Sequence, residues 1–220
     1  LVNCCDSMRR VYDIVESTGK CKFLYMLDMP HEDNDCEKVK LAQGIHRLKK
    51  AYEKFSGKPF DKSGFLNAFS HEDVDNQPYI GVLGVRVSGV LEKMIRDNIR
   101  MDVENLTCTG GRRLAVIREE LEKMEDDAMF LAYADALLSQ MPCFRMNNST
   151  RRNRLYLDPN LKGIIYHTIK FCDYYGFEYA SIKRDIKVPL LKIETDFTSQ
   201  SAGQLLTRAQ AFAETLEGSE

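Results

Sequence analysis

Cysteines are the residues of this chain best suited, by type and position, to metal or redox chemistry. Their number is odd, and 220 residues is far longer than the small proteins that depend on disulfides for stability. No two cysteines have the Cys-X-X-Cys spacing of zinc ribbons and ferredoxins. We therefore expect reduced thiols and a cytoplasmic setting. The cysteines are Cys4, Cys5, Cys21, Cys36, Cys108, Cys143 and Cys172.

Three of these cysteines occupy positions at which a metal site could form. Cys108 and Cys172 each lie beyond the carboxyl end of a predicted strand, and Cys5 lies before the start of a predicted helix. Sites in parallel α/β sheets gather at the carboxyl ends of strands, and thiolates are the usual ligands of iron–sulfur clusters. The pattern indicates a candidate iron–sulfur site. The alternative for each thiol is the role of a small buried hydrophobic side chain.

The elements that would position these thiols alternate between strand and helix. Short apolar runs predict strands, and apolar residues three or four positions apart predict amphipathic helices. Because the two kinds alternate, we expect an α/β fold with a mainly parallel sheet. The predicted strands span residues 22–28, 79–84, 100–106, 163–168 and 188–193; the predicted helices span 8–17, 33–55, 90–99, 115–141, 175–186 and 201–216, with a short helix after Asp61.

The composition is that of a globular protein and excludes some classes of function. Hydrophobic residues make up 44% of the chain and charged residues 29%. The net charge of −2 gives no electrostatic reason to expect nucleic-acid binding. No apolar run approaches the roughly 20 residues that cross a bilayer, so we expect no membrane association. The sequence opens on Leu1 without a signal peptide, and we expect residues to precede it in the natural protein.

Several sequence segments form a recognisable series along the chain. At the carboxyl end, Lys170-Phe171-Cys172 is followed by Glu178 and then by residues 189–196 and 204–214. Nearer the start are residues 5–10 with 27–30, then 106–112, then Pro142-Cys143. In this order the segments resemble the 2-hydroxyacyl-CoA dehydratase and benzoyl-CoA reductase family, and component D of 2-hydroxyglutaryl-CoA dehydratase in particular.

The resemblance implies a Rossmann-like architecture, with parallel sheet layers flanked by helices and a helical linking segment. It also implies a [4Fe–4S] cluster held by three cysteines, of which the second falls on Cys5 and the third on Cys172. Cys108 and Cys143 match family positions that are not taken as ligands. The implied partners are a second family subunit and an ATP-hydrolysing activator protein. The activator passes a low-potential electron to the cluster, and the acyl-CoA substrate becomes a ketyl radical from which hydroxide leaves.

The sequence also departs from the family pattern. The first cluster cysteine would lie upstream of Cys5, in an amino-terminal α/β domain that this sequence lacks, and a helical stretch is missing between Ser70 and His71. Either segments are omitted from the sequence, or the chain is a natural short relative. We expect residues 1–70 to be a remnant of the first α/β domain plus a helical segment, and residues 71–220 to be a carboxyl-terminal Rossmann-like domain.

Three classes of function follow from the resemblance. The first is the iron–sulfur subunit of a 2-hydroxyacyl-CoA dehydratase-like enzyme, which is a lyase. The second is a double-cubane-type ATP-dependent reductase of small molecules with an [8Fe–9S] cluster, which the adjacent Cys4 and Cys5 favour. The third is a non-catalytic family member that acts as an interaction partner.

Several further residues have a functional and a structural interpretation. His167, inside a predicted strand, is either a core histidine or a hydrogen-bond donor to a cluster sulfur. Glu194 and Asp196 are either a proton-handling pair or loop-holding residues. Arg208 could face the cluster or the CoA phosphates, or form a salt bridge. The glycines around Gly84 fit neither phosphate-binding fingerprint, which favours a tight strand-to-helix turn.

Overall fold

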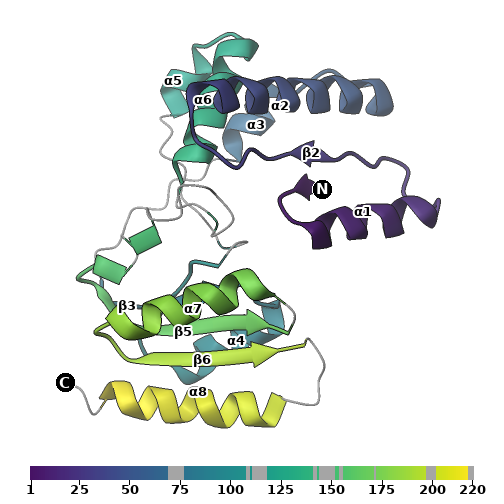
Figure 1. Cartoon of the computed structure of the whole chain (residues 1–220). Helices are drawn as coiled ribbons and strands as arrows, with labels where there is room; N and C mark the ends of the chain where they lie inside the picture. The colour runs from purple at the N-terminus through teal and green to yellow at the C-terminus, as the bar shows by residue number, and fades with distance from the viewer. Residues whose placement is uncertain are drawn as a thin grey trace. The chain divides into compact units, whose positions relative to one another are not determined.

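The computed structural model contains two compact units, which are shown in Figure 1. Unit 1 comprises the described parts of Leu1–Glu72 and Arg113–Pro142, and unit 2 comprises most of the remaining chain. Each unit has its own hydrophobic core. The structure describes residues 1–68, 77–107, 110, 118–140, 143, 152–153, 156–170, 172–196 and 202–217.

In the described residues of unit 2 there is a four-stranded sheet in which all neighbouring strands are parallel. The strand order is β4-β3-β5-β6. The chain adds β4 on one side of β3 and then returns to add β5 and β6 on the other side, so the strand order reverses between β3 and β5. This order and the flanking helices confirm the predicted α/β fold. The strands are β3 (Tyr79–Gly84), β4 (Asp102–Asn105), β5 (Leu161–Ile169) and β6 (Leu190–Thr195).

Helices cover both faces of this sheet, because successive strand residues point to opposite sides. Ile80 and Val82 pack with α4 (Gly89–Asn98) and with Phe212 of α8 (Ala202–Glu217). On the other face, Leu83 and Ile164 pack against α7 (Asp173–Asp185). Figure 1 shows α7 and α8 on opposite sides of β5 and β6. Since both faces are buried, the central strands β3 and β5 are mostly apolar and buried.

Unit 1 is mainly helical. Its longest helix, α2 (Asp35–Ser56), begins where the Asn34 side chain accepts a hydrogen bond from the Glu37 amide, and it ends at Gly57 with φ +68°. Its core is formed by α2 with the shorter helices α3 (Lys62–Asn67), α5 (Arg118–Glu122) and α6 (Asp126–Ser139). The same unit contains α1 (Asp6–Ser17) and the parallel pair β1 (Val2–Asn3) and β2 (Leu27–Asp28).

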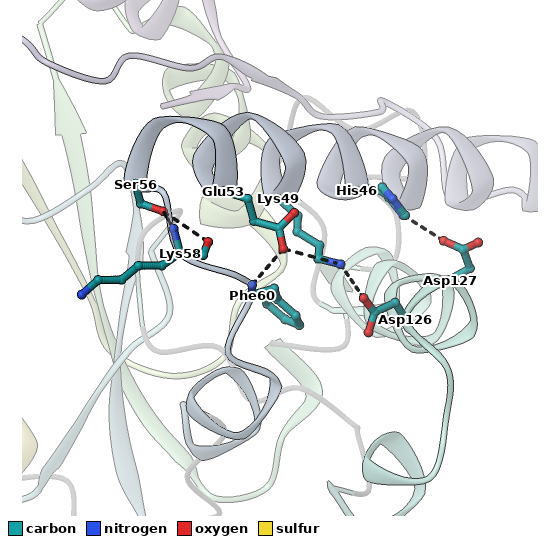
Figure 2. A network of polar contacts seen from close by, with 8 residues as sticks. All are labelled: His46, Lys49, Glu53, Ser56, Lys58, Phe60, Asp126 and Asp127. Carbon is teal, nitrogen blue, oxygen red and sulfur yellow. Dashed lines mark hydrogen bonds and ion pairs between the residues drawn. The ribbon is translucent and has the colours of Figure 1, made fainter.

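Polar contacts on the surface of unit 1 join α2 to α6 (Figure 2). His46 Nδ1 lies 2.8 Å from Asp127 Oδ1, and the Lys49 ammonium contacts Asp126. Beneath them Phe130, only 1% exposed, packs edge-on against His46. Partly exposed ion pairs contribute about 0–1 kcal/mol each, so apolar packing supplies most of the stability of this contact.

Two predicted elements differ from the structure. The helix predicted over 115–141 is divided into α5 and α6, and its first residues lie outside the described part of the chain. Lys62 stabilises the break, because its ammonium donates to the Glu122 carbonyl at 2.9 Å and also to the Met124 carbonyl. The strand predicted over 22–28 pairs only at Leu27 and Asp28.

The proposed division at residue 70/71 stays a prediction. Helices α5 and α6 follow that boundary in the sequence and pack in unit 1. The chain therefore returns to unit 1 after forming β3, α4 and β4 in unit 2.

Candidate functional site

A pocket of about 530 Å³ lies in unit 2, at the carboxyl ends of β5 and β6 and beside the first turns of α7. Its walls come from the sheet face that α7 covers. This is the edge at which parallel α/β sheets place their sites. The lining residues are Thr168, Ile169, Lys170, Cys172, Asp173, Gly176, Phe177, Lys192 and Glu194.

Cys172 is the N-cap residue of α7 and the thiol of this pocket. Its amide donates to the Ile169 carbonyl at 3.1 Å, which closes the turn after β5. Its side chain makes no capping hydrogen bond and is partly buried. The positive end of a helix dipole stabilises a thiolate, so this position suits a metal-binding or reactive cysteine.

Lysine–carboxylate pairs surround the pocket. Lys170 Nζ lies 3.0 Å from Asp196 Oδ2, and hydrogen bonding to that carboxylate raises the pKa of Lys170. Lys192 Nζ lies 3.4 Å from Glu194 Oε2 and 5.2 Å from the ring centroid of Tyr179. Because Glu194 and Asp196 each have a lysine partner, their contacts favour the structural interpretation over a proton-handling pair.

A buried polar cluster holds α7 on the sheet. The carboxylate of Glu178, in the middle of α7, is 3% exposed and accepts hydrogen bonds from two guanidinium nitrogens of Arg152, one of them at 3.0 Å. It also accepts from the hydroxyl of Tyr156 at 2.8 Å and from that of Tyr166 on β5. The Arg152 guanidinium lies 5.9 Å from the ring centroid of Tyr175. We call Arg152, Tyr156, Tyr166, Tyr175 and Glu178 the Glu178 cluster.

Two side chains of the Glu178 cluster have raised pKa values. Burial lowers the pKa of Arg152, but hydrogen bonding to Glu178 and its negative charge outweigh burial and leave that pKa raised. Burial and the Glu178 charge both raise the pKa of Tyr166, so its hydroxyl stays protonated and donates. Residue patterns did not identify Arg152, Tyr156 or Tyr166. A usable signal was Glu178, a charged residue on the same helical face as Tyr175 and Ile182.

Cys5 belongs to unit 1 and has the same local setting as Cys172. It follows β1 and is the N-cap residue of α1, and its carbonyl accepts from the Met8 and Arg9 amides. Each cysteine is followed by aspartate at the first helical position, Asp6 or Asp173. Both units therefore contain a strand, then cysteine and aspartate, then a helix.

The structure distributes the remaining cysteines as follows. Cys143 is partly buried; its Sγ lies 3.3 Å from the Tyr175 hydroxyl, and its side chain packs with the α7 core. Cys108 lies outside the described residues. The described cysteines form no disulfide with one another, and the described residues include no group of three or more histidines, cysteines, aspartates or glutamates that could hold a metal ion.

His167 and Arg208 make structural contacts. His167 is fully buried between the carbonyl of Val85, at 3.0 Å, and the hydroxyl of Thr195, at 2.8 Å. This is the core-histidine interpretation. Arg208 donates to the carbonyl of Lys192 at 2.7 Å, so it ties α8 to β6.

The turn after β3 has the form that its glycines predict. Gly84 has φ +95°, and a Cβ there would lie 2.1 Å from the carbonyl oxygen of His167. The Val85 amide donates to the same oxygen at 2.9 Å. Glycine is required here because the turn is pressed against β5.

Fold and pocket define a doubly wound parallel α/β protein with a thiol-containing site at the carboxyl ends of its strands. Within this class the chain belongs to the family described as 2-hydroxyglutaryl-CoA dehydratase, D-component, which matches residues 71–216. Members of this family are generally associated with iron–sulfur clusters. Cys172 lies inside the matched region and Cys5 lies outside it.

A curated relative supports the same family. The chain is 28% identical over 153 residues to "Putative dehydratase subunit YjiM" of Escherichia coli (strain K12). The match covers 65% of this chain and 39% of the relative, so the chain spans about two fifths of that protein. Over the part of the chain that the structure describes, every helix is too short or too polar to cross a bilayer.

Proposed function

We propose that this chain is an iron–sulfur subunit of a 2-hydroxyacyl-CoA dehydratase-like enzyme, in which Cys5 and Cys172 are cluster ligands. The main support for this proposal is the position of Cys172. Its thiol lines the pocket at the carboxyl end of β5, at a helix N-terminus, within the part of the sequence that matches the family.

The residues present fit an iron–sulfur cluster as part of a ligand set. Both cysteines are N-cap residues whose side chains make no capping hydrogen bond, and the positive end of each helix would stabilise a thiolate and an anionic cluster. The resemblance implies a third cysteine ligand, which would lie upstream of Cys5. When bound, the cluster would supply low-potential electron transfer and an iron open to substrate.

The chain's own residues would hold the cluster and shape its surroundings. Thr168 and Gly176 line the pocket beside Cys172, so they would define the space next to the metal. Phe177 is 69% exposed at the pocket, where it offers an apolar contact to a substrate. The paired charges of Lys170 and Lys192 would orient polar substrate groups without leaving an isolated charge.

Other parts of the proposal rest on family membership alone. They are an acyl-CoA substrate, a second family subunit, an ATP-hydrolysing activator that delivers the electron, and a cytoplasmic location. In this scheme the protein positions the cluster and limits water access, and the cluster performs the electron chemistry.

One observation favours a second function, that of a double-cubane-type ATP-dependent reductase of small molecules. Cys4 is exposed and directly precedes Cys5, so the sequence has two adjacent cysteines where one cluster ligand is expected. An [8Fe–9S] cluster would require more thiolates than a [4Fe–4S] cluster.

Iron analysis of protein that is produced with its native amino terminus, purified anaerobically and reconstituted tests both functions. About four irons per chain would support the dehydratase-like subunit, and about eight the double-cubane reductase. Cys172→Ala and Cys5→Ala should each lose iron. The matched control is Cys36→Ala, which removes an exposed thiol from α2. A wild-type chain without iron would refute both functions, and iron retained by Cys172→Ala would refute that ligand.

A further inference from the structure

The polar residues behind the pocket contact one another around a single helix. Helix α7 supplies four pocket residues, Cys172 at its N-cap and Asp173, Gly176 and Phe177 in its first turns. It is fixed by the face it turns to the sheet, where Tyr175, Glu178 and Ile182 are buried. The position of the Cys172 sulfur therefore depends on how α7 sits on the sheet.

Glu178 joins that face of α7 to neighbouring segments through hydrogen bonds. Its carboxylate accepts from Arg152, Tyr156 and Tyr166, so the helix is bonded both to β5 and to the segment before β5. Tyr166 and Thr168 point to the same side of β5, and Thr168 lines the pocket. The Glu178 carboxylate is therefore bonded to Tyr166, which lies two residues before Thr168 of the pocket wall.

We propose that Glu178 is the positioning residue for Cys172. It acts through Tyr166 and Arg152, which fix the first turns of α7 and thereby the position and exposure of the Cys172 thiol. Buried charge pairs are not required for stability, since apolar pairs of similar volume can replace them. Four hydrogen bonds to one carboxylate do restrict the helix to a single rotation and translation.

The first experiment uses the metal-free full chain, so it does not depend on the proposed cluster. Iodoacetamide alkylation, followed by peptide mass spectrometry, gives the rate at Cys172 separately from the other cysteines. Glu178→Gln removes the charge and keeps the shape. Tyr166→Phe is a milder variant that removes one hydroxyl and keeps the ring. We expect both to change the Cys172 rate by on the order of tenfold and to leave the rate at the exposed Cys36 unchanged.

The matched control is Tyr79→Phe. The Tyr79 hydroxyl donates to Asp158 at 2.9 Å, another tyrosine–carboxylate bond in the same core. Tyr79 pairs with Leu161 at the start of β5, whereas Cys172 follows the end of that strand. Tyr79→Phe should lower the melting temperature about as much as Tyr166→Phe and leave the Cys172 rate unchanged. If Tyr166 had a purely structural role, Tyr166→Phe and Tyr79→Phe would have the same effect on the Cys172 alkylation rate.

A second measurement uses the same variants after reconstitution with iron. This measurement, unlike alkylation, rests on the proposed function. We expect Tyr166→Phe to alter the electron paramagnetic resonance spectrum of the reduced cluster and Tyr79→Phe to leave it unchanged. Unchanged Cys172 alkylation in both Glu178→Gln and Tyr166→Phe would overturn the positioning role. Absence of iron from the wild type would overturn the proposed function and leave the alkylation result to decide the positioning role.

Discussion

The imidazole Nδ1 of His167 lies 3.0 Å from the carbonyl oxygen of Val85. Because a carbonyl can only accept, Nδ1 carries the proton, and Nε2 accepts from the Thr195 hydroxyl 2.8 Å away. One neutral ring therefore connects β5 to the turn after β3 and to the last residue of β6. This contact lies on the α4 and α8 side of the sheet, where Ile165 also packs.

Acidification is expected to destabilise the protein through His167. Burial lowers the pKa of His167 below the ordinary value of 6.5, against the opposing effect of its backbone hydrogen bonds. Below about pH 6.5 the unfolded chain therefore binds more protons than the folded chain. This contribution to the free energy of unfolding is present above about pH 6.5 and is lost as the pH falls through the folded pKa.

Urea denaturation on both sides of that pH measures the effect. His167→Gln keeps a side-chain amide near the same partners without a titrating group. Its stability should decrease less on acidification than that of the wild type. An equal decrease in both proteins would assign the effect to other groups.

Gly84→Ala is expected to lower the free energy of unfolding by about 1–3 kcal/mol. The backbone φ of +95° strains any L side chain, and the new Cβ would overlap the His167 carbonyl. Gly89→Ala is the control, because a Cβ there meets nothing within 4 Å and the position begins α4. Urea midpoints compare the two variants, and similar losses in both would show that the turn is not the cause.

Breaking the buried ion pair should be far more costly than breaking an exposed one. Glu178→Ala leaves Arg152 buried without its carboxylate, and we expect a loss of about 3–5 kcal/mol. Asp97→Ala removes the partner of Lys93 on the surface of α4, where both side chains are more than half exposed, and should cost less than about 1 kcal/mol. Chemical denaturation measures the free energy of unfolding of both variants. Comparable losses would contradict the burial of the Glu178–Arg152 pair.

Apolar packing, rather than the ion pairs of Figure 2, should hold α2 and α6 together. Phe130→Ala is expected to destabilise unit 1 by about 3–5 kcal/mol, because its ring contacts Phe60, Phe65 and His46. Asp127→Ala removes the His46 contact and should cost at most about 1 kcal/mol. The unfolding of each variant can be followed by the loss of helical circular dichroism. A larger loss for Asp127→Ala would reverse the ranking.

Much of the fold could be predicted because its central strands β3 and β5 are mostly apolar and the elements are bounded by turn residues. The strand predicted over 79–84 is β3, and the helix predicted over 90–99 is α4 to within one residue at each end. The helix caps Asn34 and Asp61 accept hydrogen bonds from amides three residues further along the chain. Such caps can therefore be predicted from the local sequence. The break between α5 and α6 depends on Lys62, a residue distant in sequence, so local patterns could not predict it.

The candidate site was predictable only in part. The junction of strand and helix at Cys172 follows from a local pattern, and the structure places the thiol in a pocket there. Arg152 follows no periodic pattern, and arginine is rarely buried without a partner. Its role depends on meeting Glu178 across 26 residues. The assignment of Cys5 and Cys172 as ligands stays a prediction.

The order of the four strands in unit 2 has a further consequence for solubility. β4 and β6 stand at the two ends of that order, and a free strand edge can recruit another copy of the chain into a growing sheet. β4 has only four residues and carries Asp102 and Glu104, while β6 carries Lys192 and Glu194. Short strands and charged side chains discourage such edge-to-edge joining. The sheet that holds Cys172 in place is thereby also protected against aggregation.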